Sequence, residues 1–108
     1  MRNIISASIL FLCFLIPAFA GSQTGQVTSV QVRASDGLII VFLSGTPSGR
    51  PACATISYWM IKNENSVAGK QQLAQLLTAR ATGQVITIVG SNTCSRWADG
   101  EDIDLIVF

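Results

Sequence analysis

The sequence predicts a mainly β domain with one helix and one disulfide bond. Three observations lead to this prediction. Five short runs are rich in β-branched and aromatic residues, and one stretch between them has helical periodicity. Two cysteines remain once an N-terminal export signal is set aside. The expected body is therefore small, mostly β and cross-linked.

The first twenty residues have the features of a signal peptide. Arg2 gives a positive start, the run ISASILFLCFLIPAF is almost wholly apolar, and Ala18-Phe19-Ala20 fits the small-x-small pattern before a cleavage site. A retained membrane anchor is the less favoured alternative, because the apolar run is shorter than the ~20 residues that a span needs. Cleavage after Ala20 leaves residues 21–108, a single domain of 88 residues.

Charge and cysteine content narrow the class of protein. After cleavage, six Lys and Arg residues balance six Asp and Glu residues, which argues against a general nucleic-acid binder or a polybasic membrane-surface protein. Cys53 and Cys94 remain, and in an exported chain they indicate one disulfide bond. A zinc site is disfavoured because the sequence has no histidine to complete it.

Three strands are predicted before the helix, over residues 26–33, 38–43 and 52–62. The first alternates with one slip, which suggests a bulge. Ser35-Asp36-Gly37 is typical of a tight turn, and the buried run LIIVFL follows it. In the third run, Trp59 and Ile61 share one face, so Trp59 is expected in the core.

One helix is predicted over residues 67–81. Asn65 or Ser66 would be its N-cap, and Gly83 fits the left-handed position that ends a helix. Its apolar stripe consists of Leu73, Leu76, Leu77 and Ala81. Two strands follow, over residues 84–89 and 103–108.

The element order β-β-β-α-β-β is that of the OB-fold, a five-stranded Greek-key barrel. An open α+β sheet with the helix across one face is the alternative architecture. We favour the OB-fold-like barrel.

The acidic stretch near the end of the chain has two interpretations. A turn at Asp99-Gly100 followed by a strand would put Asp102 and Asp104 in solvent, with Ile103, Leu105 and Val107 on the core face. The alternative is a weak calcium site. The acids lack EF-hand spacing, because no glutamate stands at the twelfth position of a loop that begins at Asp99.

Catalysis is not expected. Without histidine there is no Ser-His or Cys-His pair, and both cysteines would be used in the bridge, so we predict neither an enzyme nor a cofactor. Tyr58, Arg96 and Trp97 are the candidates for recognising a ligand. An aromatic ring beside polar side chains suits a sugar. Equally, Trp97 would cap the barrel end, with Arg96 paired to Asp99 or Glu101.

The segments SGTPSGRPACA and LAQLLTARATGQVITI, with an aromatic strand between them, resemble the subtilase cytotoxin B-subunit-like proteins. These are secreted receptor-binding subunits of bacterial toxins built from one active chain and a five-membered ring. The resemblance covers residues 37–88. This chain is shorter than those subunits, and its second cysteine lies in NTCSRW, where they carry a longer tail.

The resemblance implies a secreted or periplasmic OB-fold protein that forms a homo-oligomeric ring, a pentamer if toxin-like. It further implies a cell-surface glycan as the ligand and a catalytic A chain as a partner. The family's glycan pocket uses a serine in an early strand with polar and aromatic neighbours. Ser35, Lys62 and Arg96 are candidates for it, without a residue-by-residue match. A free-standing periplasmic protein that binds a small ligand, peptide or metal is the alternative function.

Overall fold

The computed structural model describes residues 20–108, so residues 1–19 of the predicted signal peptide lie outside the described range. The described residues form β1 (Ser22–Val32), β2 (Ile39–Leu43), β3 (Trp59–Ile61), α1 (Val67–Thr82), β4 (Val85–Gly90) and β5 (Glu101–Val107). The predicted order of three strands, one helix and two strands is confirmed. Within residues 20–108, no helix is long and apolar enough to cross a membrane.

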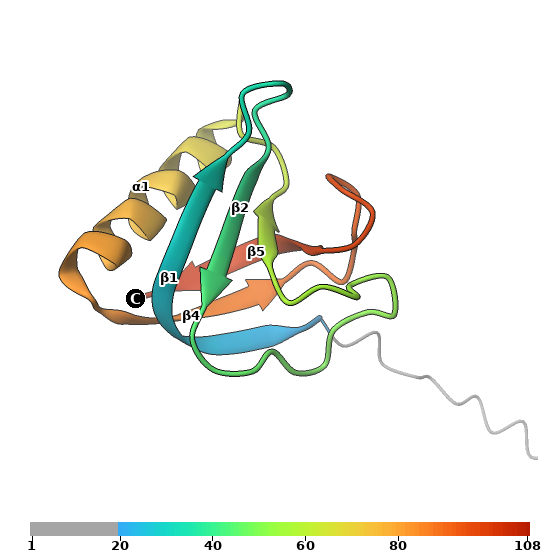
Figure 1. Ribbon diagram of the computed structural model, residues 1–108, viewed down its shortest axis with the longest axis horizontal. Helices are drawn as coiled ribbons and strands as arrows, with labels where there is room; N and C mark the ends of the chain where they lie inside the picture. Colours follow the sequence, from blue (N-terminus) through green and yellow to red (C-terminus); the bar gives the residue numbers. More distant parts are fainter. Residues whose placement is uncertain (1–19) are drawn as a thin grey trace, which may run out of the picture.

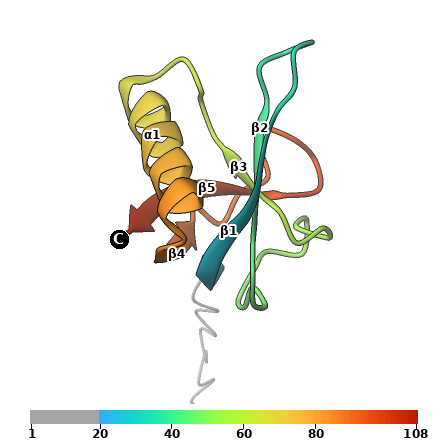
Figure 2. The ribbon, with the colours of Figure 1, turned by 60° about the vertical axis from the view of Figure 1, so that its left-hand side comes forward.

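The strands close into a barrel in the order β1-β2-β3-β5-β4, with β1 pairing β4 to complete it. Neighbouring strands are antiparallel except for β3 and β5, which are parallel. The helix α1 connects β3 to β4 and lies against β1 (Figures 1 and 2). This is the OB-like Greek-key arrangement, and a closed barrel excludes the open-sheet alternative.

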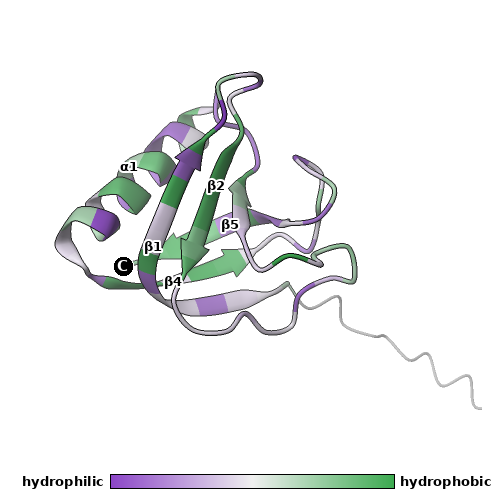
Figure 3. Cartoon of the chain, viewed as in Figure 1, coloured by the Kyte–Doolittle hydropathy of each residue, from purple (hydrophilic) through white to green (hydrophobic). Residues whose placement is uncertain are grey.

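The core lies inside the barrel and continues under the helix. Trp59 and Ile61 of β3 are fully buried, as predicted for Trp59, and Leu76 and Ala79 of α1 pack against the same cluster. Hydrophobic residues accordingly run along β2 and β4 in Figure 3. Burial of each large apolar side chain stabilises the fold by about 1.5–3 kcal/mol, so this cluster dominates folding.

The strand β1 begins at Ser22, four residues earlier than predicted. Its first half shows no apolar alternation because Gln23, 3% exposed, points a polar side chain into the core. The Nε1–H of Trp59 donates to Gln23 Oε1 at 2.8 Å. Gln23 Nε2 in turn lies 3.0–3.2 Å from three carbonyl oxygens, those of Leu43, Ser44 and Gly45.

The predicted strand over residues 52–62 is wrong except for its last part, Trp59–Ile61. Arg50 explains the difference. Its two Nη groups donate to the carbonyl oxygens of Ile56, at 2.6 Å, and Tyr58, at 2.5 Å. Because a side chain takes these acceptors, the backbone ahead of Trp59 turns back on itself instead of pairing with β2.

A disulfide bond joins Cys53 to Cys94, as predicted. The two residues are 41 positions apart and lie in the segment before β3 and in the loop between β4 and β5. The bond therefore fastens two irregular segments that the barrel itself does not pair.

The helix is capped at both ends by the residues that the sequence indicated. Ser66 Oγ accepts a hydrogen bond from the backbone N–H of Gly69 at 2.9 Å. Gly83 adopts a left-handed φ of 70°, and its N–H donates to the carbonyl of Ala79 at 2.9 Å. Gly69 has a packing reason as well, because a Cβ there would overlap the backbone carbonyl of Asn63.

The predicted faces of β5 are wrong on both sides of Ile103. Leu105 and Val107, expected in the core, are 51% and 46% exposed, whereas Asp102, expected in solvent, is fully buried. A bulge in β5 explains the exposure of Leu105 and Val107. Val89 pairs with Leu105, but the next residue of β4 pairs with Ile103, so β5 carries one extra residue and the alternation reverses after Ile103. Asp102 stays on the face opposite Ile103 and is buried because the loop between β4 and β5 covers it and donates hydrogen bonds to its carboxylate.

Candidate functional site

Two loops meet at one end of the barrel: residues 33–38, between β1 and β2, and residues 91–100, between β4 and β5. In OB-folds these are the loops that, with the face of β2 and β3, bind oligonucleotides and oligosaccharides. Arg96 joins them. Its Nη2 donates to the carbonyl oxygen of Asp36 at 3.0 Å, and its Nη1 lies 3.6 Å from Asp36 Oδ2.

Arg96 also holds a third segment, the connection from β3 to α1. Its Nε and Nη2 donate to the two carboxylate oxygens of Glu64 at 3.1 and 2.9 Å, a bidentate pair. The hydrogen bond from Arg96 lowers the pKa of Glu64, and Glu64 raises the pKa of Arg96. Arg96 therefore pairs with neither Asp99 nor Glu101, and the predicted pairing is wrong.

Trp97 presents its ring beside the place where loops 33–38 and 91–100 meet, which we call the junction. It is 44% exposed, and the guanidinium carbon of Arg33 lies 4.2 Å from the ring centroid. Arg33 is itself fixed, because its Nε and Nη2 donate to the carboxylate of Asp36 at 2.9 and 2.6 Å. Chiefly through the hydrogen bond from Arg33, the pKa of Asp36 lies well below its usual range.

The loop 33–38 is the predicted tight turn, and its own hydrogen bonds hold it. Gly37 adopts a φ of 78° and donates its N–H to the carbonyl of Arg33 at 2.8 Å. The N–H of Leu38 donates to Asp36 Oδ1 at 3.1 Å. Ser35 is exposed in this loop, next to Asp36, so the structure brings Ser35, Arg96 and Trp97 to the same end of the barrel.

Tyr58, the second aromatic candidate, is buried under this end and is not presented to a ligand. It is 6% exposed, its ring meets the edge of Phe42 with centroids 5.9 Å apart, and its hydroxyl donates to Asp99. Burial, with the Asp99 hydrogen bond as the next cause, raises the pKa of Tyr58 to about 12. Its role here is to support the loop above it.

The acidic stretch separates into side chains with different partners. Asp99 accepts from Tyr58, Glu101 accepts from the backbone N–H groups of Gly21 and Asn92, and Asp102 accepts from loop 91–100. Asp104 is exposed. Among residues 20–108, no group of three or more acidic or cysteine side chains is arranged to hold a metal ion.

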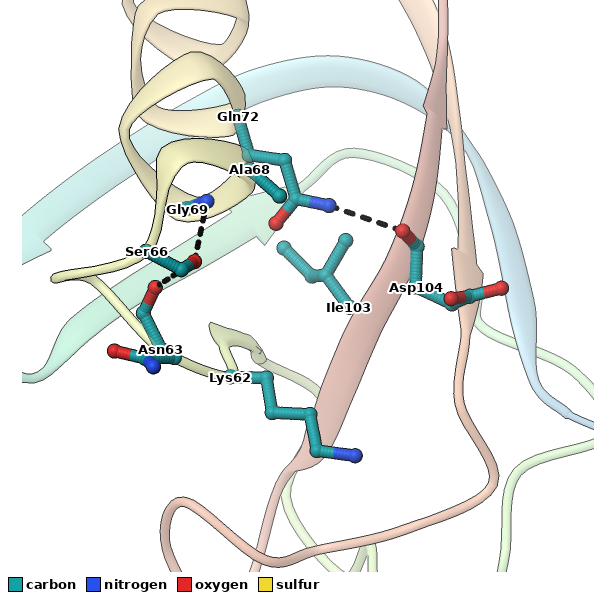
Figure 4. A pocket seen from close by; sticks show the side chains of 8 residues that line it. All are labelled: Lys62, Asn63, Ser66, Ala68, Gly69, Gln72, Ile103 and Asp104. Atoms are coloured by element: carbon teal, nitrogen blue, oxygen red, sulfur yellow. Dashed lines mark hydrogen bonds between the residues drawn. The ribbon is translucent and has the colours of Figure 1, made fainter.

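Lys62 lies elsewhere. It lines a shallow hollow of about 200 Å³ between the start of α1 and β5, together with Asn63, Ser66, Ala68, Gly69, Gln72, Ile103 and Asp104 (Figure 4). Gln72 Nε2 crosses this hollow to donate to the carbonyl of Asp104 at 3.0 Å. No residue of loops 33–38 and 91–100 contributes to it, so Lys62 is not part of the site at the barrel end.

Three residues of the junction escaped sequence reasoning: Arg33, Asp36 as a side-chain partner, and Glu64. Arg33 and Asp36 stand three positions apart around a turn, which is the spacing of a local ion pair and offered a signal. Glu64 offered none, since its partner Arg96 lies 32 positions away and only the fold brings them together.

Comparisons of the chain with protein-family models, with curated proteins and with solved structures find no match. The junction combines an exposed indole, two fixed guanidinium groups, an exposed hydroxyl and two carboxylates, all on connections between the elements of the fold. It is suited to binding a neutral polar ligand.

Proposed function

We propose that the protein is an exported, non-catalytic binding protein that holds a cell-surface glycan at the junction of loops 33–38 and 91–100. The observation that carries this proposal is the exposed ring of Trp97 beside Arg33, on loops joined by the contacts between Arg96 and Asp36. A sugar has an apolar C–H face that packs on an indole and hydroxyls that bond to charged side chains.

The charge of the junction favours a sugar over a nucleic acid. Arg33 and Arg96 are already neutralised by Asp36 and Glu64, so the loops offer no uncompensated basic groove for phosphates. Ion-paired carboxylates and guanidinium groups still have free lone pairs and N–H donors for hydroxyl groups. Since Arg33 lies against the ring of Trp97, a sugar would contact the remaining exposed part of the indole.

Ring formation is the second part of the proposal, and the outer face of β4 and β5 supports it. Val85, Leu105 and Val107 are 46–54% exposed. Val107 pairs with Thr87, and Leu105 with Val89, so these side chains share one face of the sheet. An apolar face of this kind suits burial against a second copy of the chain, as in the homo-oligomeric rings of the toxin subunits that the sequence resembles.

A glycan array tests the ligand. The natively exported protein should bind a subset of immobilised glycans, and Trp97→Ala should abolish that binding while the free energy of unfolding changes by about 1 kcal/mol or less. Leu77→Ala is the control for an exposed apolar side chain, because Leu77 is 51% exposed on α1. If Trp97→Ala unfolds the protein, the ring is a cap and the proposal fails.

A matched arginine pair sharpens the test. Arg33→Ala removes the cation beside Trp97 and should weaken glycan binding, whereas Arg80→Ala, on an exposed turn of α1, should leave binding unchanged. Equal effects of the two substitutions would mean that binding depends on overall charge and not on this junction.

Light scattering tests the ring. The wild-type protein should have the mass of a multiple of the mature chain, five copies if it follows the toxin subunits. Leu105→Asp should shift it to a monomer, while Val67→Asp, at an exposed position of α1, should not. A monomeric wild type that binds no glycan would support the free-standing periplasmic protein instead. The catalytic partner chain stays a prediction, to be sought by co-purification from the native cell.

A further inference from the structure

Glu101 is a buried carboxylate whose two oxygens differ in their hydrogen bonds. It is fully buried at the start of β5. Its Oε2 accepts from the backbone nitrogens of Gly21, at 3.0 Å, and Asn92, at 2.9 Å. Within residues 20–108, its Oε1 accepts no hydrogen bond and lies 3.6 Å from Arg50 Nε, which is likewise without an acceptor. A buried charged oxygen without a donor is costly, so this one calls for a further partner.

The cation nearest to Glu101 is already committed to other acceptors. Both Nη groups of Arg50 donate to backbone carbonyl oxygens, and the guanidinium carbon lies 4.4 Å from the ring centroid of Trp59. Arg50 therefore faces Oε1 only with its Nε, at a distance too long for a hydrogen bond. Among the described residues, Glu101 Oε1 therefore still lacks a donor, and the backbone of Gly21 lies beside it.

Gly21 is fitted closely to this carboxylate. A Cβ at position 21 would overlap Glu101 Oε1 and the Arg50 side chain, and a Cβ at Gly90 would overlap the same carboxylate. The carbonyl of Gly21 accepts from Gly90 N at 2.8 Å, and the next residue, Ser22, exchanges two backbone hydrogen bonds of 2.9 Å with Ser48. The nitrogen of Gly21 is thus held on Glu101 by the barrel itself.

The same nitrogen belongs to the bond that the sequence marks for cleavage. Ala18-Phe19-Ala20 is the small-x-small pattern of a signal peptidase site, and the predicted cut falls between Ala20 and Gly21. The cleavage pattern and the buried carboxylate are independent observations, one from sequence and one from packing. They meet at one backbone atom.

We propose that hydrolysis of the Ala20–Gly21 bond is a maturation step that places the new α-ammonium group of Gly21 against the buried carboxylate of Glu101. One water is consumed: its hydroxyl group goes to the carbonyl carbon of Ala20 and one hydrogen to the nitrogen of Gly21. The new acid on Ala20 ionises and the amine takes up a proton, since a free α-amine is mostly protonated at neutral pH. One N–H donor becomes three.

Maturation would act on the candidate site as well as on the N-terminus. Asn92 N donates to the same oxygen of Glu101 as Gly21 N, and Asn92 is the second residue of loop 91–100, which carries Arg96 and Trp97. The processed N-terminus, Glu101 and the start of loop 91–100 form one buried unit. An uncleaved amide at position 21 has no positive charge and one N–H donor, whereas the α-ammonium group has a positive charge and three donors.

The decisive experiment compares four proteins in a double-mutant cycle. The natively exported chain, shown by intact mass to begin at Gly21, is compared with a chain that keeps Ala20 alone, each with and without Glu101→Gln. Keeping Ala20 converts the ammonium group back to an amide with the least added bulk. Equilibrium unfolding in urea is the measurement, and neither a ligand nor a glycan array is needed.

We expect Glu101→Gln to increase the unfolding constant at least tenfold more in the chain that begins at Gly21 than in the chain that keeps Ala20. An equal effect in both chains, or a natural N-terminus at a different residue, would overturn the proposal. Glycan binding plays no part in either measurement, so the proposed function stands or falls separately.

The wild-type protein gives a further measurement that holds if Glu101→Gln does not fold. The α-amine of Gly21 should react with an acylating reagent at least tenfold more slowly in the folded protein than in the peptide GSQT. A rate equal to that of the peptide would mean that the amine is free in solvent, and the proposal would fail. Lys70, exposed on α1, provides the internal reference for reagent activity.

Discussion

The carboxylate of Asp102 accepts two hydrogen bonds from Ser95, one from its backbone N–H at 2.8 Å and one from its hydroxyl at 2.6 Å. The hydroxyl of Thr93 and the N–H of Arg96 add two more, at 2.6 and 3.0 Å. A single buried side chain of β5 thus sets the path of loop 91–100. The position of Arg96, and with it the junction of the candidate site, depends on this anchor.

Replacing this anchor should be costly. Asp102→Ala leaves buried donors of the loop without an acceptor, so we expect a loss of about 3 kcal/mol in the free energy of unfolding, measured in urea. The same variant should show faster amide hydrogen exchange in residues 91–100. Asp104→Asn, on the exposed side of the same strand, should change stability by about 0.5 kcal/mol or less. Similar losses in both variants would contradict the anchoring role.

Acid should weaken the junction before it unfolds the barrel. Hydrogen bonds from Arg33 and Arg96 lower the pKa values of Asp36 and Glu64. In the unfolded chain, Asp and Glu side chains titrate near pH 4. As the pH falls, the unfolded chain therefore binds protons before the folded protein does. The stability that these pairs contribute is therefore present above about pH 4 and is lost as the pH falls through the folded pKa values.

Asp102 adds to the same slope. Burial by itself raises the pKa of Asp102, but the hydrogen bonds from Ser95 and Thr93 outweigh burial and lower it. Urea unfolding between pH 6 and pH 2 measures the slope. Asp36→Asn combined with Glu64→Gln should flatten it in part. A slope unchanged in that double variant would show that the ion pairs of Asp36 and Glu64 are not linked to folding.

Tyr58 is the one tyrosine of the sequence, so its ionisation can be followed by absorbance without interference. We expect a midpoint of about 12 in the folded protein, because burial and the hydrogen bond to Asp99 disfavour the phenolate. Since the folded pKa lies above the unfolded value, stability is unaffected below about pH 10 and falls as the pH rises towards the folded pKa.

The Asp99→Asn variant separates the two causes of the Tyr58 shift. Burial is the larger cause, so the midpoint should fall but stay above the value of about 10 found for a free tyrosine. Circular dichroism should confirm that the protein is still folded at each point. A midpoint near 10 in the folded wild type would mean that Tyr58 is open to solvent.

The disulfide bond should contribute a large share of the stability. Closing a loop of 41 residues stabilises a fold by about 4 kcal/mol in the chain-entropy model. A Cys53→Ser, Cys94→Ser double variant should lose roughly that amount in urea unfolding, with loop 91–100 affected before the strands. If the thiols of the natively exported protein react freely with a maleimide, the bond is absent and the prediction is wrong.

Sequence patterns predicted elements whose determinants are local. Ser66 and Gly83 delimit the helix through bonds to residues three or four positions away; Gly83 was predicted, and Ser66 was one of the two predicted N-cap residues. Asp36-Gly37 likewise makes its turn with its own neighbours. Both partners of such a hydrogen bond lie within a few positions of each other, so a single sequence is enough to predict it.

Elements that depend on distant partners were mispredicted. The segment before Trp59 alternates like a strand, but Arg50 takes its carbonyl groups. Leu105 changed faces because of a bulge opposite β4, and Asp102 is buried because loop 91–100 covers it. Of the predicted binding residues, Ser35, Arg96 and Trp97 meet at the barrel end, whereas Tyr58 is buried below and Lys62 lies elsewhere. No periodicity along the chain reports such contacts.

Gln23 is a polar residue buried in the core, which a search for hydrophobic residues does not find. It gives a last prediction. Gln23→Leu has nearly the same volume but leaves Trp59 Nε1–H and three backbone carbonyl groups without their partner. We expect a loss of about 2–4 kcal/mol in urea unfolding, since buried polar groups lose their hydrogen bonds and gain no water. Gln31→Leu is the matched control, because the side chain of Gln31 is exposed on the same strand and donates to the hydroxyl of Ser29. If Gln23→Leu were neutral or stabilising, the polar network inside the barrel would be dispensable, and Trp59 would be held by apolar packing alone.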